Sequence, residues 1–404
     1  MENTKRKLRI MKSKITIITE YYNSSNYGGN LQAYALTRFL NTNGYTAEQL
    51  QYKRPLRSFK DDWRETEGLG NKLALFTKKV IQKTLKRSEF NRVKKRRKLV
   101  INFGRTMTPH TEGAYSDQEL EEFNNGSGSQ LSNPLTEFGI FITGSDQVWR
   151  TIDKRAYFLT FVPKGKKKLS YAASISKGSL TEREKKFFAA GLRDFVAVSV
   201  REKSDVALLK DIYTKDVEWV LDPTLLLDEG QWAEITSPRL RKEKYVFCYF
   251  LGGEKEPRQI ARAYAERHGL KLLTMPYLTG GYPFMDFFIK KGNEERLFEV
   301  GVEDFLSLIK YAEYVFTDSF HAVVFSGIFK TQYFVFERAI SVSMNSRIKS
   351  LVEIYETSER FCDTKEKERM EYLESLEDID YSRELLKLES MKKKSKKWLL
   401  ENVK

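Results

Sequence analysis

The sequence predicts an α/β protein built from two Rossmann-like domains that face each other across a cleft. Short apolar runs alternate with amphipathic segments along most of the chain, a pattern typical of parallel sheets covered by helices. The 404 residues are enough for two domains of ordinary size. The pattern breaks at Asp222-Pro223 and then begins again, so we place the first domain at residues 14–225 and the second at 226–363.

The first domain alternates strands with helices. A strand at 14–19 leads to a helix at 30–43, which ends before Gly44, a favourable helix stop. Strands then follow at 46–52, 138–143, 168–173, 195–200 and 217–221, with helices at 181–192 and 202–209. These short apolar runs, separated by helices, are typical of strands buried in a parallel sheet.

The alternation weakens at about 53–134, where we expect a basic helical insertion. Between Lys78 and Lys98 there are eleven Lys or Arg residues and one acid, Glu89. Apolar residues recur within this run as on an amphipathic helix. The run is therefore either a solvated helix face or a peripheral contact with an anionic membrane. The insertion ends in residues 124–129, a loop by composition.

The second domain repeats the alternation. A short helix at 231–235 precedes strands at 245–251, 270–274, 314–317 and 333–336 and helices at 257–268, 302–311 and 322–329. The chain ends in a charged tail at 364–404 with a helical pattern. It begins with a basic extension at 1–13 that lacks the apolar core of a signal peptide.

Composition narrows the class of protein. No apolar run approaches the roughly 20 residues that span a bilayer. Two cysteines, Cys248 and Cys362, provide neither a disulfide framework nor a metal cluster. We therefore expect a cytoplasmic protein, in contact with the inner face of the membrane if its basic helices bind there. The net charge of +15 would also suit nucleic acid, but the chain has no recognisable nucleic-acid module, so none is expected as a partner.

Unusual residues follow the strands of the first domain. Gly28 and Gly29 precede a helix start, where glycine allows close approach of a ligand but also suits a tight turn. Gly144 is followed by three polar residues, of which Asp146 either points into a crevice or caps a helix. Arg201 ends the strand at 195–200, where it either binds an anion or pairs with Glu202.

His321 follows a strand of the second domain and stands at the start of a helix. In open α/β sheets ligands bind at the carboxyl ends of the strands, and helix starts there favour anions. The imidazole either moves protons near neutral pH or serves as a capping or packing group. Asp318 either orients that imidazole or caps the helix, and Ser319 has a hydroxyl to donate to an oxyanion.

Six of these segments, in this order, resemble the polysaccharide pyruvyl transferase family. They are NYGGNLQAYAL at 26–36, GSDQVW at 144–149, SYAAS at 170–174, SVREK at 199–203, VLDPT at 220–224 and DSFH at 318–321. The resemblance covers roughly residues 14–340 apart from the insertion. It implies a GT-B-type fold and an enzyme that transfers the enolpyruvyl group of phosphoenolpyruvate to a sugar of a bacterial surface polysaccharide or its precursor. The product is a pyruvate ketal on two hydroxyls, with release of phosphate.

The resemblance also implies roles for residues. His321 is similar to the essential histidine of the family, a general acid, and Arg201 to its donor-binding arginine. The family carries a further arginine where this chain has Ser319, so Lys203 or Arg347 supplies that charge here, or the donor differs. The predicted site has His321 and Asp318 as catalytic residues and Arg201, Ser319, Gly28, Gly29, Asn30, Ser145, Asp146, Gln147 and Lys203 as substrate-binding residues, with no metal ligand.

The expected partners are phosphoenolpyruvate and a glycan or lipid-linked glycan acceptor, with no cofactor. Two alternatives stay open. A GT-B glycosyltransferase that uses a nucleotide sugar would share the fold and the crevice. A non-catalytic glycan- or membrane-binding relative would keep the scaffold, and Ser319 is the residue in favour of it.

Overall fold

The computed structural model describes residues 13–54, 87–125, 133–276, 292–338, 342–362, 369–383 and 385–404. The expectations for the N-terminal extension, for the first part of the insertion and for most of the loop that ends it lie outside these ranges. Within them, no helix combines the length and apolar character that a membrane span requires.

The first sheet consists of seven parallel strands in the order β3-β2-β1-β4-β5-β6-β7. The strands are β1 (Lys14–Ile18), β2 (Ala47–Tyr52), β3 (His110–Tyr115), β4 (Phe138–Thr143), β5 (Lys167–Ser170), β6 (Phe195–Val200) and β7 (Val217–Trp219). Its helices are α1 (Tyr27–Thr42), α4 (Arg87–Thr106), α5 (Asp117–Asn125), α6 (Glu182–Leu192) and α7 (Lys203–Leu209). The strand order reverses between β1 and β4, which is where doubly wound sheets bind ligands.

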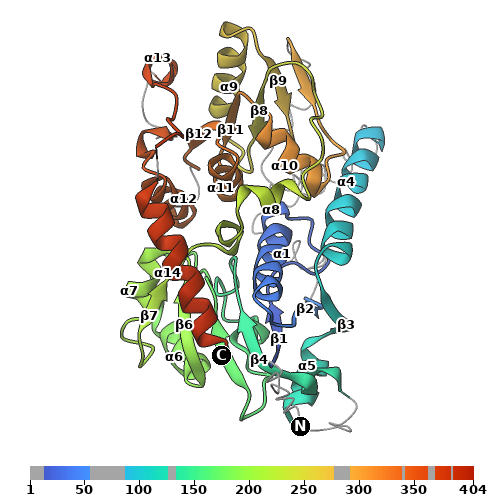
Figure 1. The fold of residues 1–404 in the computed structure, drawn as a ribbon, viewed down its shortest axis with the longest axis vertical. Coiled ribbons are helices and arrows are strands. Elements are labelled where there is room, and N and C mark those ends of the chain that lie inside the picture. Colours follow the sequence, from blue (N-terminus) through green and yellow to red (C-terminus); the bar gives the residue numbers. More distant parts are fainter. Residues whose placement is uncertain are drawn as a thin grey trace, which may run out of the picture.

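The second sheet consists of six parallel strands in the order β10-β9-β8-β11-β12-β13 and reverses between β8 and β11. The strands are β8 (Tyr245–Tyr249), β9 (Lys271–Thr274), β10 (Glu294–Arg296), β11 (Tyr314–Thr317), β12 (Gln332–Phe336) and β13 (Phe361–Cys362). Its helices are α9 (Glu256–Arg267), α10 (Val302–Lys310), α11 (Phe320–Ile328), α12 (Val342–Ile354) and α13 (Arg369–Ser375). The two sheets form the two halves of the elongated molecule (Figure 1).

The halves are joined by η4 (Pro223–Leu226) and α8 (Glu229–Ala233), and they share one hydrophobic core. Trp232 of α8 is completely buried, and its ring contacts Tyr34 of α1 and Phe325 of α11, with centroids 5.7 and 4.8 Å away. The Tyr27 hydroxyl donates to the Val300 carbonyl oxygen at 2.7 Å. These contacts fix the carboxyl ends of one sheet relative to those of the other.

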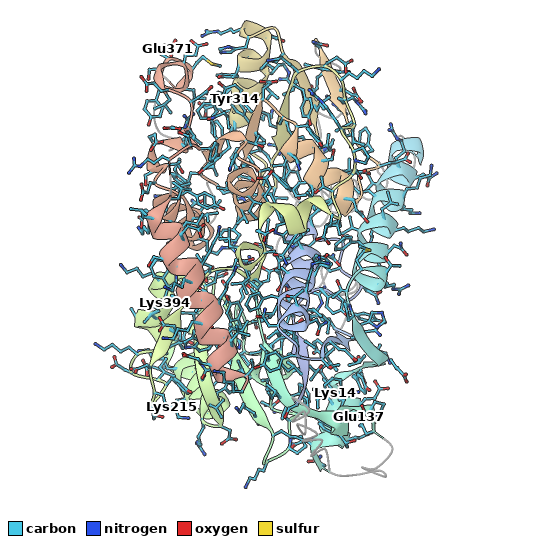
Figure 2. The ribbon with its side chains drawn as sticks, in the orientation of Figure 1. Lys14, Glu137, Lys215, Tyr314, Glu371 and Lys394 are labelled. Carbon is cyan, nitrogen blue, oxygen red and sulfur yellow. The ribbon has the colours of Figure 1, made fainter. Side chains whose placement is uncertain are left out.

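The C-terminal helix α14 (Leu386–Asn402) runs back from the second half to the first (Figure 1). Its Ser395 hydroxyl accepts a hydrogen bond from the Leu221 amide at 3.0 Å. Lys394, labelled in Figure 2, pairs with Glu218 at 2.6 Å. The tail that the sequence predicts as charged and helical thus packs across the residues that follow β7.

The predicted insertion is not a purely helical addition. It contributes β3, which pairs in parallel with β2 and forms the edge of the first sheet. The segment HTEGAY has only one large apolar residue, Tyr115, so its strand pattern is weak in the sequence. The apolar face of α4 is also occupied, since Val100 and Phe103 are buried in contact with the core around α1.

Candidate active site

The loop after β1 is held by side chains at the start of α1. Asn26 caps this helix, accepting from the Gly29 amide at 3.3 Å. Asn30 is fully buried and donates to the carbonyl oxygens of Ser24 and Asn26 at 3.0 and 2.8 Å. Of the residues predicted here to bind substrate, Asn30 is therefore engaged in fixing the loop.

Gly28 lies against the imidazole of His321, which comes from the other half of the molecule. A Cβ added at Gly28 would be 2.0 Å from His321 Nδ1 and 2.4 Å from Cε1. Only glycine permits this approach. Gly28 thus does more than permit a tight turn, because it leaves space for the histidine beside the first sheet.

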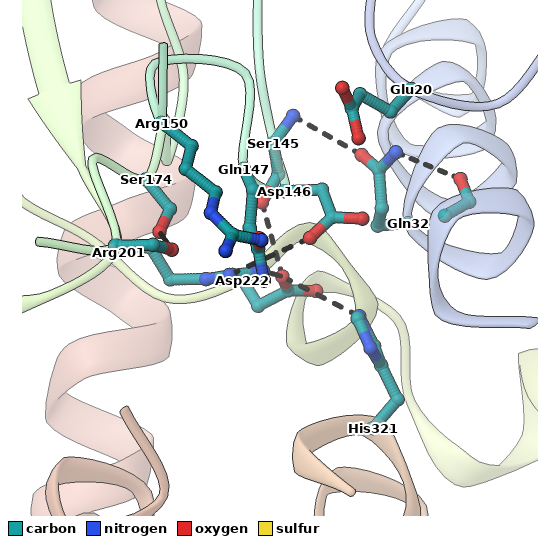
Figure 3. Close-up of polar contacts among 12 residues, drawn as sticks. Glu20, Gln32, Ser145, Asp146, Gln147, Arg150, Ser174, Arg201, Asp222 and His321 are labelled. Carbon is teal, nitrogen blue, oxygen red and sulfur yellow. Dashed lines mark hydrogen bonds and ion pairs between the residues drawn. The ribbon is translucent and has the colours of Figure 1, made fainter. Parts of the chain in front are cut away.

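The loop after β4 connects α1 to the centre of the site (Figure 3). The Ser145 amide donates to Gln32 Oε1 at 3.1 Å, and the Ser145 hydroxyl donates to Asp222 Oδ2 at 3.1 Å. Asp146 has a φ of 64° and caps no helix, and its carboxylate faces Arg201 at 3.8 Å. Of the two interpretations of Asp146, the structure supports a residue that points into the site.

Arg201 and Asp222 form the buried centre. Arg201 Nη1 donates to Asp222 Oδ2 at 2.9 Å, and its Nε donates to Glu202 Oε1 at 3.0 Å. Burial alone would lower the pKa of Arg201, but Glu202, Asp222 and Asp146 outweigh burial and raise it. The remaining nitrogen, Nη2, is buried, lies 3.8 Å from Asp146 Oδ1 and makes no hydrogen bond within the part of the chain that the structure describes. The pairing with Glu202 expected as an alternative is thus present, and it leaves one guanidinium nitrogen for a ligand.

His321 reaches this centre from the first turn of α11. Its Nε2 lies 3.9 Å from Asp222 Oδ2, is buried and makes no hydrogen bond with any described residue. Burial lowers the pKa of His321 below 6.5, against the raising effect of Asp222 and Asp146, and Arg201 and Arg347 lower it further. The imidazole is therefore neutral at pH 7 in the free protein.

Asp222 keeps its negative charge. Burial raises its pKa, but His321, Arg201 and the hydrogen bonds from Thr224 outweigh burial and lower it. The Asp222 carboxylate is the acid nearest to His321 and can stabilise the imidazolium form. In the sequence, Asp222 marked only the break between the two domains. Its position after the last strand of the first sheet, in the segment VLDPT, was the signal for a site residue.

Asp318 does not have the position expected for it. Its carboxylate accepts hydrogen bonds from the backbone amides of Leu251 and Gly252, both at 2.7 Å, and pairs with Arg338 at 3.0 Å. It therefore ties the end of β11 to the end of β8 and does not orient the imidazole. It is not the helix cap either, since Ser319 occupies that position.

Three other predicted residues lie less centrally. Ser319 is buried at the start of α11, where its amide donates to Thr317 Oγ1. Gln147 accepts a hydrogen bond from exposed Arg150 at 3.3 Å. Lys203 is exposed, with its ammonium over the Trp219 ring, whereas Arg347 of α12 is buried beside the site. Of the two proposed substitutes for the missing arginine, Arg347 is the one whose charge acts on Arg201 and on His321.

Among the described residues, no group of three or more His, Cys, Asp or Glu side chains could hold a metal ion. The arrangement instead offers a neutral histidine, a carboxylate able to stabilise its protonated form, and cationic groups with unused donors. Such a site can bind an anion and transfer a proton to it.

Two Rossmann-like halves with a polar site where their strand ends meet define a GT-B-type protein. The fold is similar to the UDP-GlcNAc 2-epimerase from Methanocaldococcus jannaschii, with a TM-score of 0.51 and 11% identity over 94% of this chain and 98% of that one. It is also similar to the UDP-N-acetylglucosamine 2-epimerase from Rickettsia bellii, with a TM-score of 0.51 and 8% identity over 97% and 96%. At such identities the likeness concerns the fold alone.

The sequence matches the model of the polysaccharide pyruvyl transferase family over residues 26–339. The chain belongs to this family, which confirms the resemblance seen in its six segments. It is accordingly a transferase enzyme of polysaccharide biosynthesis. Among curated protein sequences, none matches the chain significantly.

Proposed function

We propose that this enzyme transfers the enolpyruvyl group of phosphoenolpyruvate, without a cofactor, to a sugar of a bacterial surface polysaccharide or its precursor. The observation that carries the proposal is the meeting of His321 with Arg201 and Asp222. A histidine from one half, with Nε2 unpartnered, lies 3.9 Å from a buried carboxylate of the other half. That carboxylate also holds an arginine whose Nη2 faces Asp146 at 3.8 Å but makes no hydrogen bond within the described residues.

Donor binding rests first on Arg201. Its ion pairs with Glu202 and Asp222 hold the guanidinium in one orientation, so little side-chain entropy is lost when a ligand binds. Nη2, which lies too far from Asp146 for a hydrogen bond, can donate a charge-assisted hydrogen bond to an oxyanion of the donor. Such a bond contributes about 1.5–3 kcal/mol.

His321 is the proposed proton donor. In the free protein its imidazole is neutral, because burial holds its pKa below 6.5. An anionic donor beside the ring favours the protonated form, so donor binding itself raises the pKa of His321. Asp222 stabilises the resulting imidazolium. The acid thus becomes available when the substrate is in place.

The proposed reaction is an addition to the donor followed by the loss of phosphate. Imidazolium gives a proton to C3 of the donor, which creates an oxocarbenium centre at C2. One sugar hydroxyl adds to C2 and returns its proton to His321. The bond between C2 and the phosphate oxygen then breaks. A second sugar hydroxyl bonds to C2 to close the ketal, and the proton of that hydroxyl passes to the released phosphate. General acid catalysis of this kind contributes about 10²–10⁴-fold in rate.

The acceptor is proposed to be a glycan, in free or lipid-linked form. We further propose that exposed cations on α4 and α14 bring the enzyme to the inner, anionic face of the membrane, where a lipid-linked acceptor would lie. Since the apolar face of α4 packs on the core, this contact is electrostatic and does not insert side chains.

A thermal-shift panel tests the donor class. Phosphoenolpyruvate should raise the melting temperature, since a ligand at a hundredfold excess over its Kd adds about 2.7 kcal/mol to stability. UDP- and GDP-sugars should not. Stabilisation by a nucleotide sugar but not by phosphoenolpyruvate would support the glycosyltransferase alternative, and stabilisation by none would support a non-catalytic relative.

Arg201→Lys tests the role of Arg201 in donor binding, because lysine keeps the positive charge but lacks the planar set of N–H donors. We expect its affinity for phosphoenolpyruvate to fall by about tenfold or more. Arg239→Lys is the matched control, because Arg239 is exposed and its Nε donates only to the Arg241 carbonyl oxygen. Equal donor affinity in the two variants would contradict the role given to Arg201.

A further inference from the structure

Arg347 is a buried cation with no hydrogen-bond partner among the described residues. It lies on α12, is 6% exposed, and its Nε is completely buried without a hydrogen bond. Its guanidinium forms no ion pair among the described residues. Buried Arg258 and Arg360, by contrast, each donate to backbone carbonyl oxygens.

This position is unfavourable in the free protein. Burial lowers the pKa of Arg347 to about 10, and the charge of Arg201 contributes to the same effect. The group is still charged at neutral pH, and a buried unpaired charge is costly. A negatively charged ligand bound to both Arg201 and Arg347 would offset the repulsion between their guanidinium groups. It would also accept the hydrogen bonds that Arg347 does not make in the free protein.

The charges around Arg201 indicate which part of a ligand Arg347 meets. Arg201 faces three acids, Asp222, Glu202 and Asp146, and only its Nη2 lacks a hydrogen bond, which suits a singly charged carboxylate. Glu202 and Asp146 only partly offset the charge of Arg347, which makes no ion pair among the described residues, so Arg347 suits a group with more charge. It also lies close enough to His321 to lower the pKa of that imidazole.

We propose that Arg347 binds the phosphate group of the donor and is a specificity-determining residue for a phosphorylated substrate. The inference rests on the proposed function and deepens it, since it divides the two acidic groups of phosphoenolpyruvate between two arginines. Arg201 takes the carboxylate and Arg347 takes the phosphate. The same contact holds inorganic phosphate after the reaction.

Isothermal titration of Arg347→Met with phosphoenolpyruvate, inorganic phosphate and pyruvate tests this division. We expect the Kd for phosphoenolpyruvate and for phosphate to rise at least tenfold, while that for pyruvate stays within twofold. The ligand-free variant should melt at the same temperature as wild type or higher, because an unpaired buried charge has been removed. Arg347→Lys, which keeps the charge, should retain part of the phosphate affinity.

Lys349→Met is the matched control, because Lys349 lies on the same helix but is exposed and pairs with Glu337. Unchanged phosphate affinity in Arg347→Met, or an equal loss for pyruvate, would overturn the inference while the proposed function stands. A fall in melting temperature in both Arg347 variants would show a structural role and would also overturn it. Wild-type protein that does not bind phosphoenolpyruvate would contradict the proposed function itself.

Discussion

Replacing Gly28 with alanine puts a methyl group where the imidazole of His321 now lies. The new Cβ would be 2.0 Å from Nδ1, whereas ordinary contacts begin near 3.4 Å. The ring must therefore move by at least about 1.4 Å, or the start of α1 must shift. Because a misplacement of about 1 Å can cost 10²-fold in rate, we expect kcat to fall about 100-fold, or about 3 kcal/mol in the barrier.

The assay is phosphate release from phosphoenolpyruvate with an acceptor glycan, together with a thermal melt. Gly178→Ala is the control, since a Cβ there meets nothing within 4 Å. In the His321→Ala background the clash is gone, so Gly28→Ala should add little further loss. A Gly28→Ala enzyme that keeps half or more of its turnover would refute the reasoning that glycine is required to seat the imidazole.

Three further outcomes follow from the same geometry. The contribution of His321 to the free energy of unfolding should be largest above pH 6.5 and fall as the pH drops below it. The reason is that the pKa of His321 is lower in the folded chain, so the unfolded chain takes up the proton more readily. In urea melts at several pH values, His321→Gln should weaken this dependence. The limb of kcat/KM that reports protonated His321 should have a lower pKa than the matching limb of kcat, since donor binding raises the pKa, and coinciding limbs would argue against that shift. Co-sedimentation with anionic vesicles should be lost at high salt, and salt-insensitive or absent binding would contradict an electrostatic membrane contact.

Apolar runs between polar turns made much of the fold predictable. The strands at 138–143, 195–200 and 314–317 were expected with the bounds that the structure gives to β4, β6 and β11. Some edge strands were not predicted, because they bury little apolar surface. β10 has the sequence EER and β13 has two residues, so neither carries a pattern that composition can reveal.

The site was predictable in its residue types but not in its pairings. Gly28, Asp146, Arg201 and His321 were expected near one another because each follows a strand. The carboxylate beside the imidazole comes from the other half of the molecule. No local sequence pattern shows how the two halves meet. Asp318, three residues from His321, binds the end of β8.

The role of Arg347 was likewise not predictable from the sequence alone. Its importance comes from the absence of a partner, and burial without a partner can be seen only when every neighbouring group has a position. The sequence suggested Arg347 and Lys203 as candidates for the missing charge, but no pattern in it shows which of the two is buried.

The most direct test of His321 as the proton donor is the rate of phosphate release by His321→Gln. The rate is measured by ³¹P nuclear magnetic resonance on samples whose affinity for phosphoenolpyruvate is known. Glutamine keeps much of the volume and polarity of the ring but cannot donate a proton as an acid. We expect donor affinity within about threefold of wild type and phosphate release lower by about 10²-fold or more. Turnover equal to that of wild type, with the donor bound, would show that His321 is not the proton donor.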